Sequence, residues 1–573
     1  MTLLKRLLPG LALLALTATF AGALSSYPSA LNRLEPEATL GQNERPVTPP
    51  AASPQARPER VVLVVLDGLR LDTSRTLPYL NGLRLKGVDA IAEAPLPSFS
   101  KPGYAAMGAG VTPWRSGVRT NAHSEPIPVD TVFARARAAG LHLVGAANHP
   151  YWPELFKDQF VRWWWVPPTS SSAEVDRAAR DILNERGALT VLHFVDIDAA
   201  GHAEGVSGAY TRAATSLDAR LKQLLAPLDL TRDLILVTSD HGHVQRGGHG
   251  GPEPEVVQVP LIMAGRGVTP GTHAEVGSLA RLAPTLSVVL SVEYPRDLSS
   301  EPLDSLLDPE VFGDAYLKAR RQEWIAHRAS YERMWLHRTL EKWTTEGWNG
   351  ERIGNDVSKA TEVADDADLS DLIAARDRTL LEIERDRRVG RTPLVALLLV
   401  GLLLVLSVGL LFGYRLLPLL TLPTFGGALT GGLLALDVPL SFSAVSSREA
   451  FLITVGVTAL LAALLHLASL EALLRTTRAP HRREARRFHA AFAALCYLTV
   501  IPLVWLLAGY HQDAPLPSPS VMFAPMWLGP AAIVFATLAA LLWCADALRK
   551  PTASRHAQES GRRSETLSPP TAH

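Results

Sequence analysis

Residues 61–68 read Val-Val-Leu-Val-Val-Leu-Asp-Gly, an unbroken apolar run that ends in a carboxylate and a glycine. Such a run predicts a strand that is buried on both faces, as in a parallel sheet covered by helices. Similar runs alternate with amphipathic stretches such as Ala173–Glu185 and Ala209–Leu225. The alternation predicts an α/β domain with a mostly parallel sheet sandwiched by helices. We expect its strands at Val61–Leu66, Leu141–Ala146, Leu189–Val195, Leu234–Thr238 and Pro260–Ala264.

The composition of the chain limits the partners and the types of metal ligand that can be expected of this domain. The chain has 573 residues and a formal net charge of +0, so the charge balance gives no reason to expect a nucleic-acid partner. Its two cysteines, Cys496 and Cys544, both lie in apolar runs near the C-terminus. We therefore expect a metal in the α/β domain to be held by oxygen and imidazole ligands rather than by thiolates.

The N-terminal residues predict export of the chain that follows them. In residues 1–25, Lys5 and Arg6 precede an apolar stretch from Leu7 to Leu24. A cleaved signal peptide and an uncleaved signal anchor both fit this pattern. Residues 26–59 are rich in Pro, Ala and Glu, and this composition predicts a flexible tether.

The composition changes again after the α/β domain, which we place at residues 60–308. Residues 309–391 are highly charged with a helical pattern, residues 392–548 predict a membrane domain with five transmembrane helices, and residues 549–573 predict a basic, disordered tail. The five spans are expected at residues 393–412, 416–436, 450–471, 490–509 and 522–545.

The distribution of arginine predicts the orientation in the membrane. The loop from Arg475 to Arg487 contains six arginines, so the positive-inside rule puts this loop and the basic tail in the cytoplasm. The α/β domain then lies on the extracytoplasmic side. Because arginine is much more frequent than lysine, as is typical of GC-rich bacterial genomes, we expect an integral protein of a bacterial inner membrane.

Three carboxylates follow predicted strands. Asp67, Asp198 and Asp240 each come just after the end of a strand. Because the carboxyl ends of parallel strands meet at one edge of a sheet, and α/β proteins bind ligands there, the three side chains predict a site. An Asp-Gly pair after a strand, as at Asp67, is also an ordinary turn, so that pair alone does not identify a site.

Histidines accompany two of these carboxylates. In Asp198-Ala-Ala-Gly-His202 we expect a short turn, in which the glycine lets both side chains reach one cation. Asp240 is followed directly by His241, and His249 lies in a Gly-Gly-His-Gly-Gly run. Three aspartates and three histidines favour Zn²⁺ or Mn²⁺ over Ca²⁺ or Mg²⁺.

A serine stands at the predicted start of a small-residue helix that runs to Gly110. In the structural interpretation, Ser100 is the N-cap and Pro102 occupies the first turn. In the functional interpretation, the same position places a hydroxyl where a phosphate would be held, and a neighbouring metal would make it a nucleophile. Ser98 is the alternative nucleophile, but it lacks the x-Pro-Gly that follows Ser100.

Together, these motifs resemble the alkaline phosphatase superfamily, in its branch of phosphodiesterases, nucleotide pyrophosphatases and ethanolamine-phosphate transferases. The string P-x-x-S-x-P-G at residues 97–103 resembles the nucleophile segment of GPI ethanolamine-phosphate transferases. Residues 195–202 and 239–250 resemble the metal motifs of that group, and residues 279–286 resemble the helix that closes the catalytic domain in many members. The resemblance covers roughly residues 60–305, with the motifs in family order.

The resemblance implies a two-metal site with two divalent ions, Zn²⁺ or, as the alternative, Mn²⁺. One ion would be bound by Asp198, His202 and His249, and the other by Asp67, Asp240 and His241, with Ser100 as the nucleophile and a further ligand. Asn121 would donate to a phosphate oxygen, and Lys101 could contact the substrate, although a solvated lysine is the simpler interpretation. His243 stands where relatives carry an apolar residue, and it is either an indirect neighbour of the metal or incidental.

For function, the resemblance implies a membrane-bound, metal-dependent phosphodiesterase or phosphoethanolamine-type transferase with a phosphoserine-type intermediate. Its substrate would be an extracytoplasmic phosphate ester, and a lipid-linked one would explain the membrane spans. The alternatives are a phosphatase or nucleotide pyrophosphatase on small soluble esters, or a non-catalytic membrane scaffold. The sequence does not indicate the oligomeric state.

The aromatic residues around Trp152 and Trp163–Trp165 fit a substrate lip, a membrane contact or ordinary packing.

Overall fold

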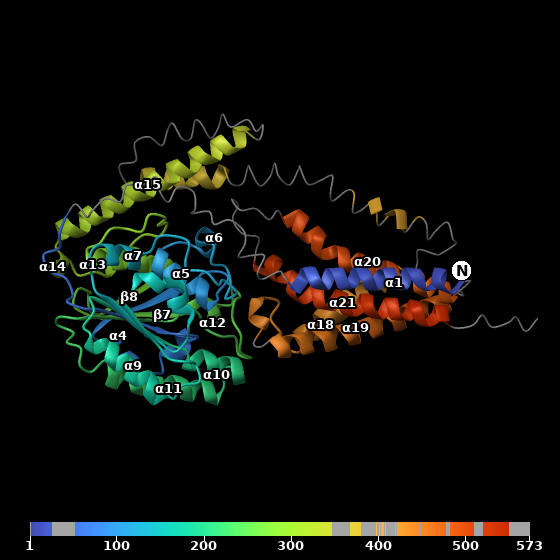
Figure 1. Ribbon diagram of the computed structural model, residues 1–573, viewed down its shortest axis with the longest axis horizontal. Coiled ribbons are helices and arrows are strands. Elements are labelled where there is room, and N and C mark those ends of the chain that lie inside the picture. Colours follow the sequence, from blue (N-terminus) through green and yellow to red (C-terminus); the bar gives the residue numbers. More distant parts are fainter. Residues whose placement is uncertain are drawn as a thin grey trace, which may run out of the picture.

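The computed structural model consists of an α/β domain and a bundle of long helices (Figure 1). It describes residues 2–25, 52–345, 367–379, 421–445, 448–476, 482–508 and 519–548, together with scattered positions between 397 and 419. The predicted tether and the predicted first C-terminal span lie wholly or mostly outside the described residues, as does the basic tail.

One sheet organises the α/β domain. Its eight strands follow the order β4-β3-β5-β1-β6-β7-β2-β8, and all neighbours are parallel except β7, which is antiparallel to both β6 and β2. The predicted mostly parallel sheet is thus confirmed. The strands are β1 (Val61–Leu66), β2 (Gly87–Glu93), β3 (Leu143–Ala147), β4 (Arg162–Trp165), β5 (Leu189–Phe194), β6 (Leu234–Thr238), β7 (Gln258–Gly265) and β8 (Thr272–Ser278).

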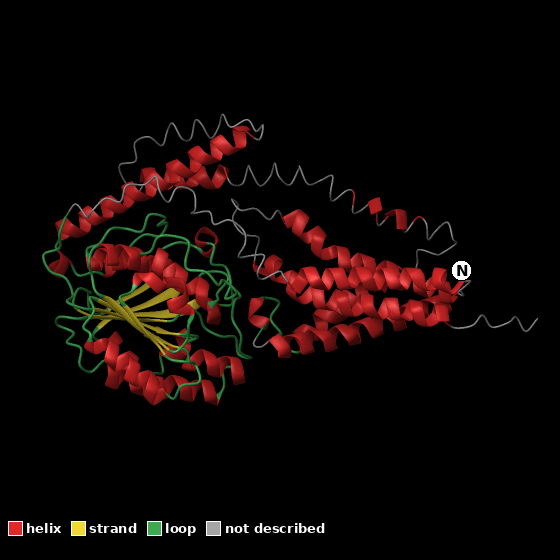
Figure 2. Cartoon of the chain, in the orientation of Figure 1, coloured by secondary structure: helices red, strands yellow, loops and turns green. Residues whose placement is uncertain are grey.

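Helices cover both faces of this sheet (Figure 2). Alternate residues of β1 point to opposite faces: Val61, Leu63 and Val65 belong to one apolar core, and Val62, Val64 and Leu66 to the other. The first core is shared with α5 (Ser100–Ala109), α7 (Val132–Ala138), α13 (Leu282–Leu290) and α15 (Asp314–Thr345). The second core is shared with α4 (Pro78–Arg84), α9 (Ser172–Asn184) and α11 (Gly208–Leu224). Shorter helices are α3 (Leu71–Ser74), α6 (Pro113–Ser116), α8 (Tyr151–Phe156), α10 (Asp196–Glu204), α12 (Pro254–Val257) and α14 (Pro309–Phe312).

Three of the eight strands were not predicted: β2 and β8 lack a continuous apolar run, and β4 has no fully buried side chain. Strands β4 and β8 form the two edges of the sheet, and β2 is the neighbour of β8. Along β8 only one of seven side chains is buried, so its sequence carries no signal of a buried strand. In β4, Trp163 lies over Gly145 of β3 and packs against Phe160, whereas Trp165 is exposed. Trp152 is fully buried and stacks on Tyr104, so ordinary packing explains it.

The second part of the molecule is a helical bundle. Within the described residues, three helices are long and apolar enough to cross a membrane: Leu3–Ser25, Glu449–Thr476 and Pro525–Leu548. The predicted spans at 416–436 and 490–509 overlap helices that do not meet these criteria, so they stay predictions. Trp543 donates to the carbonyl of Arg6, which ties the N-terminal helix to the last one. The helices are α1 (Thr2–Ser25), α18 (Leu422–Ala435), α19 (Arg448–Thr476), α20 (Arg482–Ala508) and α21 (Pro519–Leu548), with a short 3₁₀ turn, η6 (Phe442–Ala444).

Candidate metal centre

The three predicted carboxylates meet at one edge of the sheet. Asp67 follows β1 and Asp240 follows β6, while Asp198 lies in α10, which begins two residues after β5. Since β5, β1 and β6 are adjacent parallel strands, their carboxyl ends present the three side chains to one another. The structure brings together all the acidic residues that the sequence singled out.

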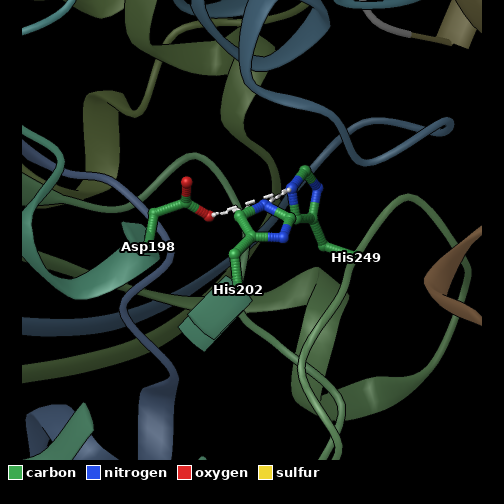
Figure 3. A group of neighbouring side chains, drawn as sticks. All are labelled: Asp198, His202 and His249. Carbon is green, nitrogen blue, oxygen red and sulfur yellow. Dashed lines mark hydrogen bonds and ion pairs between the residues drawn. The ribbon is translucent and has the colours of Figure 1, made fainter. Parts of the chain in front are cut away.

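One cluster of possible metal ligands consists of Asp198, His202 and His249, whose side chains point toward one another (Figure 3). The Nε2 atom of His202 lies 3.4 Å from Asp198 Oδ1 and 3.1 Å from His249 Nε2. The expected turn between Asp198 and His202 is wrong, because both residues belong to α10. At a spacing of four residues, they share one face of the helix and reach the same point.

A second cluster consists of Asp67, Asp240 and His241, all buried. His241 Nε2 lies 3.4 Å from Asp67 Oδ1 and 3.3 Å from Asp240 Oδ2. Both of these carboxylate oxygens are buried, and neither has a hydrogen-bond partner in the part of the chain that the structure describes. The two clusters are neighbours, since the rings of His241 and His249 stack with centroids 3.6 Å apart.

The electrostatics of the clusters favour a cation. Burial and repulsion from Asp67 and Asp198 raise the pKa of Asp240 well above its ordinary value. Burial would also raise the pKa of Asp67, but its hydrogen bond with His193 and the proximity of His241 lower it below the ordinary range. Burial lowers the pKa of His241 to about 4, so this imidazole is neutral and able to act as a ligand at pH 7.

This donor set fits a pair of divalent metal ions. Three carboxylates and three imidazoles are ligands that transition metals accept, and the orphaned oxygens of Asp67 and Asp240 have no other partner within the described residues. A divalent ion would satisfy these oxygens and relieve the repulsion that raises the pKa of Asp240.

Ser100 stands at the edge of the second cluster. It is the first residue of α5, and its Oγ lies 3.3 Å from His241 Nε2. The N-cap interpretation is wrong, because Phe99 occupies the N-cap position and no side chain caps the helix. Ser98 has a different role: its hydroxyl donates to the carbonyl of Gly251 and accepts from the N–H of Gly250, so it holds the loop that carries His249.

His243 is a functional neighbour that the sequence left undecided. Its Nδ1 accepts from the N–H of Gly248 at 3.0 Å, so in the neutral ring the proton sits on Nε2. That N–H donates to Asp198 Oδ1 at 2.9 Å. Although His243 also lies within metal-ligand distance of Asp198 and His241, this tautomer has no free lone pair for an ion. His243 therefore orients the carboxylate of Asp198 instead of binding metal.

Two further residues were missed by sequence reasoning. The hydroxyl of Tyr104 in α5 donates to Asp67 Oδ2, and it also lies 2.7 Å from His193 Nε2. His193 is the fifth residue of β5 and is fully buried beside Asp67. A histidine in an otherwise apolar buried strand was the available signal, because a buried polar side chain needs a partner.

The two predicted substrate residues differ in their surroundings. Asn121 lies beside the start of α5, where its Oδ1 accepts from the N–H of Lys101 at 2.9 Å. The side chain of Lys101 is buried and pairs with Glu154 at 2.7 Å, and its ammonium lies over the ring of Tyr151. The simpler interpretation of a solvated lysine is therefore wrong, and substrate contact by Lys101 stays a prediction.

Part of the chain matches the model of a known protein family. The model of the Metalloenzyme superfamily matches residues 154–294, which contain both histidine motifs. This match and the relatives described next confirm the predicted resemblance to the alkaline phosphatase superfamily. The match and the clusters together indicate a divalent metal as the cofactor.

Among curated proteins, the catalytic subunit of human GPI ethanolamine phosphate transferase 2 is 28% identical over 310 residues, which are 49% of this chain and 30% of that protein. GPI ethanolamine phosphate transferase 1 of Gibberella zeae is 26% identical over 293 residues, covering 43% of this chain and 30% of that protein. The chain thus covers less than a third of the length of these relatives. Murine ectonucleotide pyrophosphatase/phosphodiesterase 5 aligns in structure with a TM-score of 0.37 and 13% identity, covering 44% of this chain and all of that one.

Proposed function

We propose that the chain is a membrane-bound phosphoester transferase or phosphodiesterase that passes a substituted phosphoryl group through Ser100. The observation that carries this proposal is the position of the Ser100 hydroxyl, 3.3 Å from His241 and at the N-terminus of α5, beside the clusters of side chains that could hold metal. We propose two metal sites, Asp198–His202–His249 and Asp67–Asp240–His241, occupied by Zn²⁺ or Mn²⁺. When bound, the ions supply Lewis acidity that favours the serine alkoxide and offsets negative charge on the phosphoryl group.

The residues of the chain then account for two half-reactions. Ser100 attacks phosphorus in line, so an Oγ–P bond forms while the P–O bond to the leaving group breaks. The N-terminus of α5 faces the transferred group with its positive end, which favours the phosphoryl oxygens. Since the Oδ1 of Asn121 is engaged by the N–H of Lys101, its Nδ2 is the group that donates to a phosphoryl oxygen. Water or an acceptor alcohol next attacks phosphorus and releases Ser100.

For the substrate, we propose an extracytoplasmic, lipid-linked phosphoethanolamine-type ester. The likeness to GPI ethanolamine phosphate transferases supports the transferred group, and the three apolar helices support a location at the membrane. The second candidate is a phosphatase or nucleotide pyrophosphatase that acts on small soluble esters. It is favoured by the same metal clusters, which carry no feature specific to a lipid.

A serine substitution tests the proposal in the full-length, metal-loaded protein. Ser100→Ala should reduce hydrolysis of p-nitrophenyl phosphomonoesters and phosphodiesters by at least about a thousandfold, because the nucleophile is lost. Ser170→Ala, in the loop before α9, is the matched control and should retain full activity. Unchanged hydrolysis by Ser100→Ala would exclude the serine mechanism.

The substrate class needs a separate comparison. The same preparation in vesicles is given phosphatidylethanolamine and, in parallel, soluble phosphodiesters. Release of the lipid product with an intact Ser100, and its absence with Ser100→Ala, is the expected result. Turnover of soluble esters with no reaction of the lipid would favour the second candidate.

A further inference from the structure

A loop of the helical bundle packs against the loop that carries His249. Residues 441–445, which include η6 and lie between α18 and α19, pack against residues 246–253 of the α/β domain. We name these segments the bundle loop and the His249 loop. The side chain of Arg246 also donates to the carbonyl of Leu436 at the end of α18. The bundle loop is thus part of the surroundings of His249, although about 190 residues separate them in sequence.

The polar contacts between the two loops are reciprocal. The hydroxyl of Ser443 accepts from the N–H of Gly251 at 3.0 Å and donates to Glu253 Oε2 at 2.6 Å. The hydroxyl of Ser441 donates to the other carboxylate oxygen of Glu253. Both serines are buried. A carboxylate that accepts from two buried hydroxyls is held in one orientation, and hydrogen bonds to a charged group are among the stronger ones in proteins.

A row of edge-on aromatic rings extends this contact toward the metal centre. Phe442 of the bundle loop lies edge-on to Phe99, with ring centroids 5.6 Å apart, and Phe99 lies edge-on to His249 at the same distance. Phe99 is also the residue directly before Ser100. The bundle loop therefore contacts Phe99, which precedes the nucleophile and itself lies edge-on to the ring of His249.

The glycines of the His249 loop fit this contact closely. A Cβ on Gly250 would lie 2.5 Å from the ring of Phe99 and 2.8 Å from Phe442 Cβ. A Cβ on Gly251 would lie 2.7 Å from Ser443 Oγ and would also strike the carboxylate of Glu253. The approach of the bundle loop thus requires both glycines, and the positive φ of Gly250 is a second reason for glycine at that position.

The opposite side of His249 is fixed by the α/β domain. Its Nδ1 lies 3.0 Å from the carbonyl of Ser98, and because a carbonyl only accepts, Nδ1 carries the proton. That tautomer leaves Nε2 as the ligand atom, which lies 3.8 Å from Asp198 Oδ1. The position of Nε2 then depends on the backbone of the His249 loop, which Ser98 holds from one side and the bundle loop from the other.

We propose that Glu253, Ser441 and Ser443 are positioning residues through which the helical bundle sets the place of His249 in the metal centre. The bundle is then a structural part of the metal site in addition to its role at the membrane. The proposal goes beyond the proposed function, since it requires the ion at Asp198, His202 and His249 but no particular substrate or reaction.

Hydrogen exchange of the metal-free, full-length protein tests the contact itself. Ser443→Ala removes the acceptor of the Gly251 N–H and a donor to Glu253, so peptides over residues 246–253 should exchange at least tenfold faster. Thr458→Val removes a hydroxyl that donates within α19, to the carbonyl of Thr454, and serves as the matched control. Exchange in Ser443→Ala that equals the control would overturn the proposal.

Metal retention tests the consequence for the site. Against a chelator, Ser443→Ala and Glu253→Gln should each lose one of two bound ions about tenfold faster than wild type, the range expected for groups that orient a metal ligand. The affected ion should be the same one that His249→Ala loses first, which identifies it as the ion bound by His249. The double variant should lose the ion no faster than the more affected single variant, because the two changes break one network. Equal acceleration for both ions would indicate general destabilisation and would refute the positioning role.

Discussion

The substitution Gly201→Ala separates the positioning role of His243 from ordinary helix stability. Gly201 lies inside α10, between the metal ligands Asp198 and His202. A Cβ at this position would lie 2.7 Å from His243 Nε2 and 2.8 Å from two ring carbons. Since this contact is shorter than van der Waals distance, the ring must move away from Asp198 or the helix must shift.

Two opposing effects determine how much Gly201→Ala changes the free energy of unfolding. In a helix interior, replacing glycine by alanine is favourable by about 1 kcal/mol. Overpacking of a close-packed site is unfavourable by about 1–3 kcal/mol. For Gly201→Ala we therefore expect a net loss of about 1 kcal/mol in the free energy of unfolding, and a metal affinity lower by about tenfold because Asp198 loses its orienting partner.

Gly82→Ala provides the matched control. Gly82 lies inside α4, and a Cβ there would meet nothing within 4 Å. This variant should be more stable than wild type and bind metal equally well. The assays are thermal unfolding of the metal-free protein and metal retention against a chelator. If Gly201→Ala were stabilised like Gly82→Ala, with unchanged metal retention, the assigned role of His243 would be wrong.

Three further substitutions test other parts of the structure. Tyr104→Phe removes the hydroxyl that donates to Asp67, so metal affinity in a chelator competition should fall by about tenfold while the melting temperature of the metal-free protein changes little. Burial raises the pKa of Asp304 from 3.8 to about 6, so the folded state binds this proton more tightly and the associated stability is lost as the pH rises through about 6. Asp304→Asn should thus melt higher than wild type at pH 8 and equally near pH 4; an equal difference at both pH values would contradict this. Arg60→Ala leaves the buried carboxylate of Asp233 without its partner, and denaturant unfolding should show a loss of about 3–5 kcal/mol.

The sequence predicted the parts of the fold whose signal is local. Strands β1, β5 and β6 are mainly apolar runs in the centre of the sheet, and the carboxylates follow them closely in the chain. Strands β4 and β8 could not be predicted in this way, because an edge strand buries few side chains. The turn expected between Asp198 and His202 was wrong for a related reason: the glycine between them indicated a break, whereas it makes room for His243.

The site was predictable where the ligands come in short motifs, and unpredictable where they depend on distant segments. Tyr104 contacts Asp67 from helix α5, and His193 contacts it from the neighbouring strand β5. The buried histidine indicates that a partner is needed, but the sequence does not say which residue that partner is. Likewise, the contact of Ser443 with Gly251 joins two parts of the chain that composition assigns to different domains. Such contacts follow from the packing of the whole chain, which one sequence does not specify residue by residue.

The most direct test of the central claim is to trap the covalent adduct on Ser100. Full-length, metal-loaded protein is incubated with phosphatidylethanolamine in vesicles, quenched in acid, and digested for mass spectrometry. We expect the peptide that contains Ser100 to gain the mass of a phosphoethanolamine group, and we expect no adduct in Ser100→Ala. Turnover of the lipid with Ser100 unmodified, or an adduct on another residue, would contradict the account.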